Sequence, residues 1–187
     1  MKELWQLYNN IGTPINTKGA TDDEILSKGL LHAAAHVWVW RENNGKKELL
    51  LQKRSQNKRT WPNLLDISAA GHIDLGESPQ DAAKREAHEE LGIIIKLEDL
   101  FMFGVYRCFM VAQDGSSKEN EFCWLYTYKM VDSSTIQLAD GEVSSVVWKN
   151  IEEIKNEYSN ADLYVPHGST YFSLVFEAIE GQSNEAI

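Results

Sequence analysis

Three glutamates and one arginine fall at helical spacing in the segment that follows Gly71. Glu86 and Glu90 are four residues apart and Glu89 lies three beyond Glu86, so a helix of about 3.6 residues per turn projects all three from one side. Like charges at this spacing repel, and the cluster therefore needs positive partners. Arg85, four residues before Glu89, supplies one. A hard divalent cation such as Mg²⁺, which prefers oxygen ligands, would supply the rest.

The alternative is an ordinary solvated, charged helix face. The wider pattern argues against it, because the segment GHIDLGESPQDAAKREAHEELGI, residues 71–93, satisfies G-x5-E-x7-R-E-x-x-E-E-x-G at every fixed position. A chance match at a given start is on the order of 10⁻⁸ to 10⁻⁹ for residues of average usage. The pattern therefore indicates a built site.

The helix that carries these carboxylates has clear boundaries in the sequence. Ser78 is a good N-cap, Pro79 suits the first helical position, and Asp81 completes a capping box with Ser78. Gly92 sits where a helix commonly ends, so we expect a helix over residues 79–91. An apolar stripe at i, i+4 and i+8 would face the core, and it consists of Ala83, Ala87 and Leu91.

The remaining elements alternate between strands and helices. We expect strands at 31–40 and 47–53, joined by the turn-rich ENNG, and further strands at 64–73 (broken by Gly71), 100–111, 121–131 and 143–148. Helices are expected after a capping box at Thr21–Glu24, at 151–158 and at 170–179. This order predicts a single α/β domain over residues 1–187, with helices on both faces of a mixed sheet. Within it, 1–28 is an N-terminal extension, 29–180 the core and 181–187 a frayed tail.

The composition argues against several classes of protein and partner. The chain has 187 residues, 43% of them hydrophobic, and a net charge of −10, which argues against a nucleic-acid polymer or an anionic membrane as partner. Two cysteines are too few for a disulfide framework. No secretory signal and no apolar run of the ~20 residues that a membrane span needs are visible. We therefore expect a cytoplasmic protein.

The 71–93 pattern is the signature of the Nudix family, which this chain resembles closely. The resemblance implies an α/β/α sandwich with a mixed β-sheet and a loop–helix–loop that binds Mg²⁺, with Mn²⁺ as a possible substitute. By family pattern Glu86 and Glu90 are the main metal ligands, Glu89 is a ligand or the base that activates water, and Glu77 pairs with Arg85. The implied reaction is hydrolysis of a small diphosphate-linked substrate of the nucleoside diphosphate-X type. Ala87 departs from the family, which usually has a bulkier aliphatic residue there.

A second resemblance extends over roughly residues 30 to 150. The stretch LLLQKRSQNKRTWPNLLDISAAGHIDLGES and the segment KENEFC resemble isopentenyl diphosphate isomerase, a Nudix-fold enzyme that is not a hydrolase. By matching position, Arg54 and Lys58 resemble the cations that grip its substrate diphosphate. Its metal ligands are matched by His32, His72, Glu119 and Glu121. His72 is also placed to contact phosphate, and Glu121 to act as a base.

Three departures separate this chain from the isomerase. Its catalytic cysteine is replaced by Ala70, a further metal-binding histidine is replaced by Ile25, and the helix here keeps its full glutamate set. Hydrolysis is therefore expected, in an isomerase-like branch of Nudix hydrolases. Isomerase chemistry and a non-catalytic binding module remain as alternatives.

Several side chains have a structural interpretation beside the functional one. Residues His32 and His36 are expected to be packed or surface imidazoles, and His88 to face solvent. Trp61, Phe122 and Trp124 are expected in the core, although one could stack on a base or a prenyl group. The sequence leaves open the substrate, the general base, the number of metal ions and the oligomeric state.

Overall fold

A computed structural model describes residues 4–15, 19–58, 60–111, 115, 117–131, 136–138 and 143–182. The helices are α1 (Asp22–Lys28), α2 (Pro79–Leu91), α3 (Ile151–Glu157) and α4 (Ser169–Gly181), with a 3-10 turn η1 (Leu97–Asp99). The strands are β1 (His32–Asn43), β2 (Lys46–Arg54), β3 (Leu65–Asp66), β4 (Ala69–His72), β5 (Leu100–Val111), β6 (Lys118–Lys129) and β7 (Val143–Asn150). Residues 183–187 of the predicted frayed tail lie outside the described ranges.

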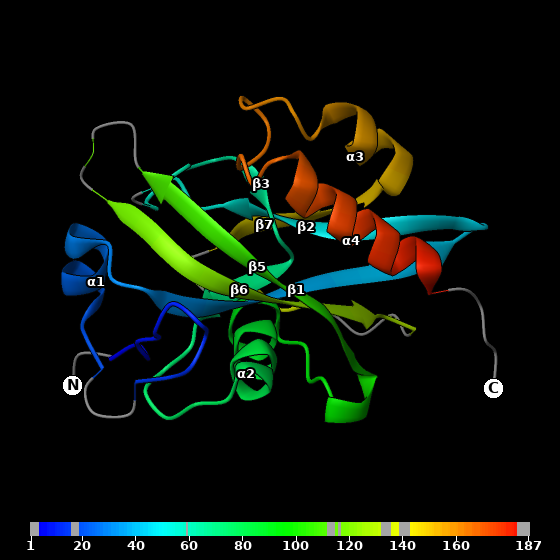
Figure 1. The fold of residues 1–187 in the computed structure, drawn as a ribbon. Helices are drawn as coiled ribbons and strands as arrows, with labels where there is room; N and C mark the ends of the chain where they lie inside the picture. The colour runs from blue at the N-terminus through cyan, green and yellow to red at the C-terminus, as the bar shows by residue number, and fades with distance from the viewer. Residues whose placement is uncertain are drawn as a thin grey trace.

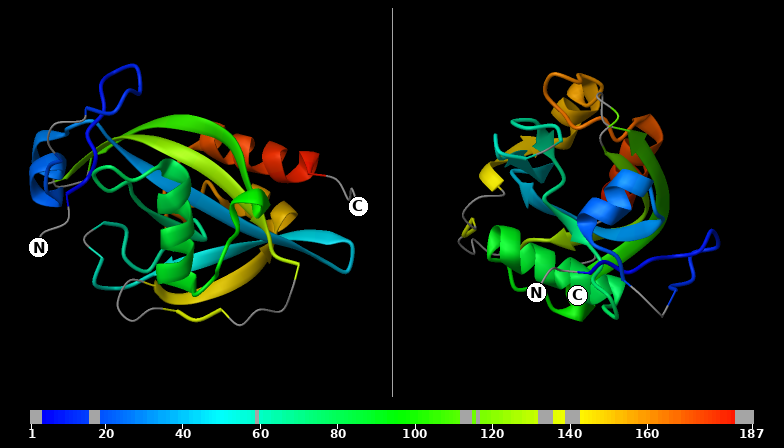
Figure 2. Two further views of the ribbon diagram at one scale, coloured as in Figure 1. Left: turned by 90° about the horizontal axis from the view of Figure 1, so that it is seen from below. Right: turned by 90° about the vertical axis from the view of Figure 1, so that its left-hand side faces the viewer.

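The strands form one mixed sheet in the order β3-β2-β1-β6-β5. Strands β1 and β6 run parallel, and the other pairs are antiparallel. Helix α2 covers one face, while α3 and α4 cover the other (Figure 1). The predicted α/β/α sandwich is confirmed. Figure 2 shows α1 and the N-terminal segment at one end of the molecule and the β1–β2 hairpin at the opposite end.

Two apolar cores hold these layers together. The first lies between the sheet and α2, and its fully buried members include Val37, Leu50, Ala83, Ala87 and Leu91. The second lies under α3 and α4, and its fully buried members include Trp38, Leu49, Ile154, Val175 and Ile179. Residues on β1 and β2 alternate between the two cores, as the period-2 geometry of a strand buried on both faces requires.

Strand β1 pairs with two different strands along one of its edges. On one edge its first half pairs with β4, from Ala34 to Val37, and its second half pairs with β2, from Trp40 to Asn43. On the other edge it pairs with β6 along nearly its whole length. Strand β2 diverges from β1 and pairs instead with β3 and β7. Helix α2 packs against β1 and β4 next to the place where β2 diverges.

The 64–73 segment differs from its prediction. We expected one extended stretch broken at Gly71, but the break lies at residues 67–68 and Gly71 is paired inside β4. Ser68 explains the break, because its hydroxyl accepts the N–H of Val39 at 2.8 Å and donates to the carbonyl of Leu50 at 2.6 Å. This buried side chain replaces strand pairing at the point where β1 and β2 separate.

Helix α1 begins at the predicted residue, but the predicted capping box is wrong. Thr21 is the N-cap with extended backbone, and its side chain makes no capping hydrogen bond. The three acidic residues of the first turn instead interact favourably with the positive end of the helix dipole.

The N-terminal extension packs against the segment that leads into α2. The backbone N–H of Gln6 donates to Ile73 at 2.9 Å, and that of Leu75 donates to Leu4 at 2.8 Å. The extension therefore fixes one side of the loop before the helix. Among the helices in the described ranges, none is long and apolar enough to cross a membrane.

The end of α2 yields a stability prediction. Gly92 has φ +68°, and a Cβ there would approach Cβ of Gln137 to 2.9 Å. Gly92→Ala should therefore lower the free energy of unfolding by about 1–2 kcal/mol. Gly181→Ala is the matched control, since a Cβ at the end of α4 meets nothing within 4 Å. Urea denaturation of both variants measures the difference, and equal stabilities would contradict the assigned helix end.

Candidate active site

Helix α2 forms as the sequence predicts, over Pro79–Leu91. The hydroxyl of Ser78 accepts the backbone N–H of Asp81 at 3.2 Å and donates to that residue's carboxylate at 2.7 Å. The apolar stripe at 83, 87 and 91 is fully buried against the sheet. Burial of this stripe fixes the rotation of the helix about its axis. The glutamates of the helix are thereby directed along one side of a cavity.

Arg85 is the centre of the polar network on α2. Its Nε and Nη2 donate to the two carboxylate oxygens of Glu77 at 2.9 and 3.0 Å. Its Nη1 donates to Glu86 and, at 3.0 Å, to Glu89. Nη2 also donates to the carbonyl of His72 at 2.9 Å. Hydrogen bonds to Glu77 and the charge of Glu86 raise the pKa of Arg85, so it stays protonated.

The observed position of the Glu86 carboxylate depends on a glycine in β4. An added Cβ at Gly71 would lie 2.0 Å from the Oε1 atom of Glu86, so only glycine leaves room for that carboxylate. One turn later, Oε2 of the buried Glu90 accepts the N–H of Ala70 at 3.0 Å and the side-chain amide of Gln52 at 3.3 Å. The spacing from Gly71 to the glutamates in the sequence thus reflects a direct contact.

The site residues predicted from the sequence surround one cavity of about 540 Å³. Those that line it are Arg54, Lys58, His72, Arg85, Glu86, Glu89, Glu90 and Glu121. Glu77 does not line it and lies behind Arg85, which it holds. The carboxylates of α2 offer only oxygen ligands from one wall of the cavity, a donor set that fits a hard divalent cation.

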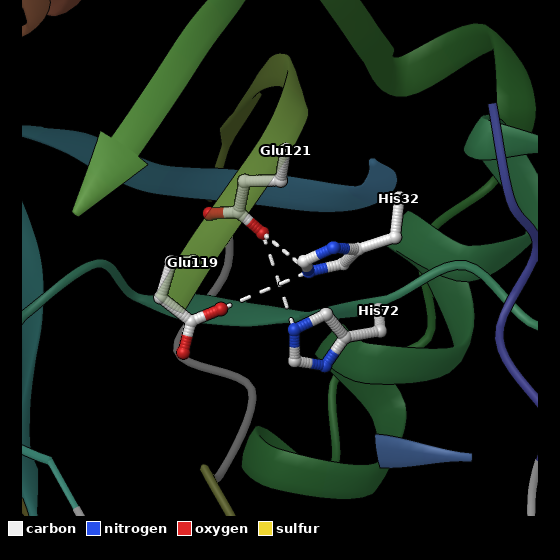
Figure 3. A group of neighbouring side chains, drawn as sticks. All are labelled: His32, His72, Glu119 and Glu121. Atoms are coloured by element: carbon white, nitrogen blue, oxygen red, sulfur yellow. Dashed lines mark ion pairs between the residues drawn. The ribbon is translucent and has the colours of Figure 1, made fainter. Parts of the chain in front are cut away.

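A second group of possible metal ligands faces the helix from the sheet. It comprises His32, His72, Glu119 and Glu121, whose ligand atoms all lie within 4.8 Å of one another. Figure 3 shows the two imidazoles from β1 and β4 directed at the carboxylates of β6. The Nε2 atom of His32 lies 3.5 Å from Glu121 and 3.7 Å from Glu119, and Nε2 of His72 lies 3.9 Å from Glu121. The same set was expected from the isomerase resemblance.

Burial and mutual contact set the charges in this group. Burial raises the pKa of the Glu121 carboxyl, but the close imidazole of His32 and the neighbouring imidazoles of His36 and His72 outweigh it and hold the pKa well below its usual range. Burial, reinforced by the charge of His32, lowers the pKa of His72 to about 3. Glu121 is therefore ionised and His72 neutral at pH 7, which are the forms that bind cations.

Trp5 also lines the cavity, which the sequence did not predict. Its indole stacks on the imidazole of His72, with ring centroids 3.5 Å apart and planes 13° apart. It also lies 5.6 Å from the ring of His32. No local motif marks Trp5, because its position depends on the pairing of the N-terminal extension with the residues after β4.

The cations from the KRSQNKR run occupy different positions in the site. Arg54 donates to Asp66 at 2.8 Å and to the carbonyl of Thr60 at 3.0 and 3.2 Å, so it holds the 55–64 loop as well as lining the cavity. Lys58 lines the same cavity. His167, which sequence reasoning missed, lies 2.7 Å from Asp66 and stacks on Tyr171. Arg54 and His167, both half-buried, thus contact the buried carboxylate of Asp66, and all three residues line the cavity.

The remaining histidines and the aromatic residues mostly lie where the sequence predicts, and Trp61 is the exception. His36 is packed as expected, with Nδ1 2.8 Å from the Tyr171 hydroxyl, and burial lowers its pKa to about 4. His88 is exposed, as predicted. Phe122 and Trp124 are partly buried and pack against the α2-side core. Trp61 is not a core residue, because it is half-buried, has φ +46° and lines the cavity.

Comparison with known proteins agrees with this geometry. The family model described as the NUDIX domain matches residues 30–167. The chain belongs to the Nudix family. An uncharacterized Nudix hydrolase of Clostridium acetobutylicum is 31% identical in an alignment 185 positions long. The alignment covers 83% of this chain and 87% of that protein. The crystal structure of DR0079 from Deinococcus radiodurans matches 94% of this chain and 98% of that chain with a TM-score of 0.65 and 18% identity, and so shares its fold.

Two further relatives differ in their named activities, one being a hydrolase and the other an isomerase. Nudix hydrolase 3 of Arabidopsis thaliana is 37% identical over 151 residues, which are 77% of this Nudix chain but only 19% of that protein. Isopentenyl-diphosphate Delta-isomerase of Escherichia coli is 34% identical over 127 residues, covering 67% of this chain and 65% of the isomerase. The chain is therefore a Nudix family member of a branch related to the isomerase.

The Arg54–Asp66–His167 group predicts a pH-dependent stability. Burial raises the pKa of Asp66, but His167 and Arg54 outweigh it and hold the pKa well below its usual value. A depressed pKa stabilises the fold above the unfolded value of ~3.9, and this contribution is lost as the pH falls below that value. Asp66→Asn should lower the free energy of unfolding at pH 7 by about 3 kcal/mol, because it removes the buried negative charge that pairs with Arg54 and His167.

Urea denaturation over a series of pH values measures this effect. The difference between the parent protein and Asp66→Asn should shrink as the pH falls below ~4. Asp162→Asn, at an exposed aspartate, is the matched control and should change stability by less than ~0.5 kcal/mol. A penalty for Asp66→Asn that is the same at every pH would refute the electrostatic account.

Proposed function

We propose that this Nudix protein hydrolyses a small diphosphate-linked substrate of the nucleoside diphosphate-X type, using Mg²⁺ on α2. The observation that carries the proposal is the complete carboxylate set around Arg85 on the wall of a substrate-sized cavity. A non-catalytic module has no need to keep like charges together at this cost. The sequence and the cavity geometry thus support the same chemistry.

Each residue of α2 has a distinct part in this proposal. Glu86 and Glu90 would hold the Mg²⁺ ion, whose chemistry is to neutralise charge on the bridging phosphate oxygens and to acidify a water molecule. Glu89 has a side chain that is 56% exposed, so it can reach solvent and accept the proton of the attacking water. Arg85 orients Glu86 and Glu89, and Glu77 holds Arg85 in place.

The opposite wall would bind the substrate. Lys58 and Arg54 provide positive charge near the cavity, and His72 and Glu121 face it from β4 and β6. Positive groups are needed here because a diphosphate would otherwise enter a site rich in carboxylates. The net charge of −10 argues against a nucleic-acid polymer, but a metal ion and a few cationic side chains can still bind a small anionic substrate in one pocket. The free cysteines, Cys108 and Cys123, are typical of a reducing compartment, so we place the reaction in the cytoplasm.

The alternative reaction is isomerisation of an isoprenoid diphosphate. Ala70 lines the cavity at the position where the isomerase has its catalytic cysteine. A methyl group neither donates nor accepts a proton, so a two-sided proton transfer across a double bond lacks one partner. Hydrolysis, which needs a base on one side of the phosphorus, requires nothing at that position.

Turnover should depend on the carboxylates of α2. Glu89→Gln and Glu90→Gln should each lower kcat at least ~100-fold, because each removes a base or a metal ligand without changing side-chain size. The assay is metal-dependent release of phosphate or a monophosphate from nucleoside di- and triphosphates, dinucleotides, nucleotide sugars and prenyl diphosphates. Glu153→Gln, an exposed change on α3, is the control and should leave kcat unchanged.

Either of two results would reject the hydrolase assignment. One is full turnover in both Gln variants. The other is proton exchange into isopentenyl diphosphate by the parent protein, without release of phosphate from any compound of the panel. Chelation of Mg²⁺ should abolish hydrolysis, and added Mg²⁺ or Mn²⁺ should restore it.

The proposed substrate contact of Lys58 makes a separate kinetic prediction. Lys58→Met should raise KM about 10-fold with little change in kcat, because a uniform contact with the bound diphosphate is lost in both ground and transition states. Lys53→Met, at an exposed position of β2, is the matched loss of one positive charge. Steady-state kinetics on the best substrate of the panel separates the two, and an equal rise of KM in both variants would assign the effect to overall charge.

A further inference from the structure

Glu121 lies between two groups of possible metal ligands. Its Oε2 atom faces His32 and His72 at 3.5 and 3.9 Å. Figure 3 shows its other carboxylate oxygen pointing away from these imidazoles. That oxygen, Oε1, lies 3.5 Å from the thiol of Cys123. One carboxylate thus presents a separate oxygen to each side.

The residues on the Oε1 side of Glu121 form a group with different donor atoms. His36, Glu121 and Cys123 each offer one ligand atom, and these atoms all lie within 4.8 Å of one another. All three residues are buried, with 5%, 6% and 1% of their surface exposed. Imidazole, carboxylate and thiol together form a mixed N, O and S donor set. This set differs from the oxygen-only set on α2.

The strands place these side chains on one face of the sheet. His36 lies four residues after His32 on β1, and Cys123 lies two residues after Glu121 on β6, so each pair shares a face. The residues next to the group on this face are small. Ala34 pairs with Cys123 and Ala70 pairs with His36, and both alanines line the cavity. The group therefore adjoins the cavity floor, from which an ion can enter.

The imidazole of His36 is held in one orientation. Its Nδ1 lies 2.8 Å from the hydroxyl of Tyr171, and that hydroxyl accepts the indole N–H of Trp38 at 3.1 Å. Tyr171 and Trp38 are both fully buried, so this orientation is fixed by packing. Preorientation by a hydrogen-bonded neighbour is a common feature of metal-binding histidines.

We propose that His36, Glu121 and Cys123 form a cation site distinct from the carboxylates of α2 and selective for a thiophilic divalent ion such as Zn²⁺ rather than Mg²⁺. Thiolate and imidazole suit Zn²⁺ and Co²⁺, whereas Mg²⁺ requires oxygen ligands. On binding, the S–H bond of Cys123 breaks, its proton passes to solvent and a sulfur–metal bond forms. With three protein ligands, a bound Zn²⁺ would keep a fourth position for water. The proposal does not depend on the hydrolase activity, because it concerns binding alone.

Cobalt substitution tests the site directly. Titration of the chelator-treated full chain with Co²⁺ should give a thiolate-to-cobalt charge-transfer absorption that saturates at one equivalent. Zn²⁺ should displace it, and excess Mg²⁺ should not. Cys123→Ser should abolish the absorption, and His36→Gln should weaken Co²⁺ binding at least ~10-fold. A saturating thiolate absorption that persists in Cys123→Ser would overturn the assignment.

Two matched variants separate this site from its neighbours. Cys108→Ser removes the other buried thiol and should keep the absorption, because Cys108 is outside the three-ligand group. His32→Gln alters the adjacent group on the same face of β1 and should also keep it. Loss of the absorption in Cys108→Ser alone would assign the cobalt to a different thiol and reject the proposal.

A measurement on the parent chain avoids any dependence on folding of the variants. X-ray absorption at the zinc edge of the Zn²⁺-loaded protein should show one sulfur scatterer at ~2.3 Å, with nitrogen and oxygen in the remaining positions. A first shell without sulfur would overturn the proposal whatever the variants do. Hydrolysis can be assayed on the same sample, so failure of the zinc site and failure of the hydrolase assignment remain distinguishable.

Discussion

The guanidinium of Arg85 is the interaction on which the rest of the site depends. It donates to three carboxylates and to the carbonyl of His72, and so joins the loop before α2, the helix and β4. The contact with Glu77 is bidentate and uses the planar fork that arginine has and lysine lacks. Without this charge the glutamates of α2 would repel one another along one side of the helix.

The sheet provides the space that this network borders. Because β1 pairs with β4 in its first half and β2 in its second, the strands on that edge separate, and Ser68 satisfies backbone groups at the point of divergence. The cavity is lined from both sides of this opening. The Glu86 carboxylate lies against Gly71 of β4, where a Cβ would occupy its place.

Charge is distributed unevenly around the cavity. The α2 wall carries carboxylates partly balanced by Arg85, and the β6 wall carries Glu119 and Glu121 beside imidazoles. Such a surface would repel the proposed diphosphate substrate, so the proposed function requires metal ions and the basic residues near β2 to offset the carboxylates. The position of Glu121, with one oxygen toward each ligand group, makes it the shared element of the sheet wall.

The sequence by itself determined the local structure and the chemistry of α2. Caps, an apolar stripe and charge spacing are short-range signals, so the helix bounds and the exposure of His88 follow from residues near one another in the chain. The Glu77–Arg85 pair was expected from the family resemblance. The isomerase resemblance also brought together the β1, β4 and β6 ligands, because matching positions carry tertiary information that spacing lacks.

Only the tertiary structure decided the contacts between distant segments. Trp5 meets His72 because the N-terminal extension pairs with the residues after β4, and His167 meets Asp66 across about a hundred residues of chain. The same holds for His36 and Cys123, which adjoin only because β1 and β6 run parallel in one register. Register and strand order arise from the packing of the whole sheet, and no local pattern of residues encodes them.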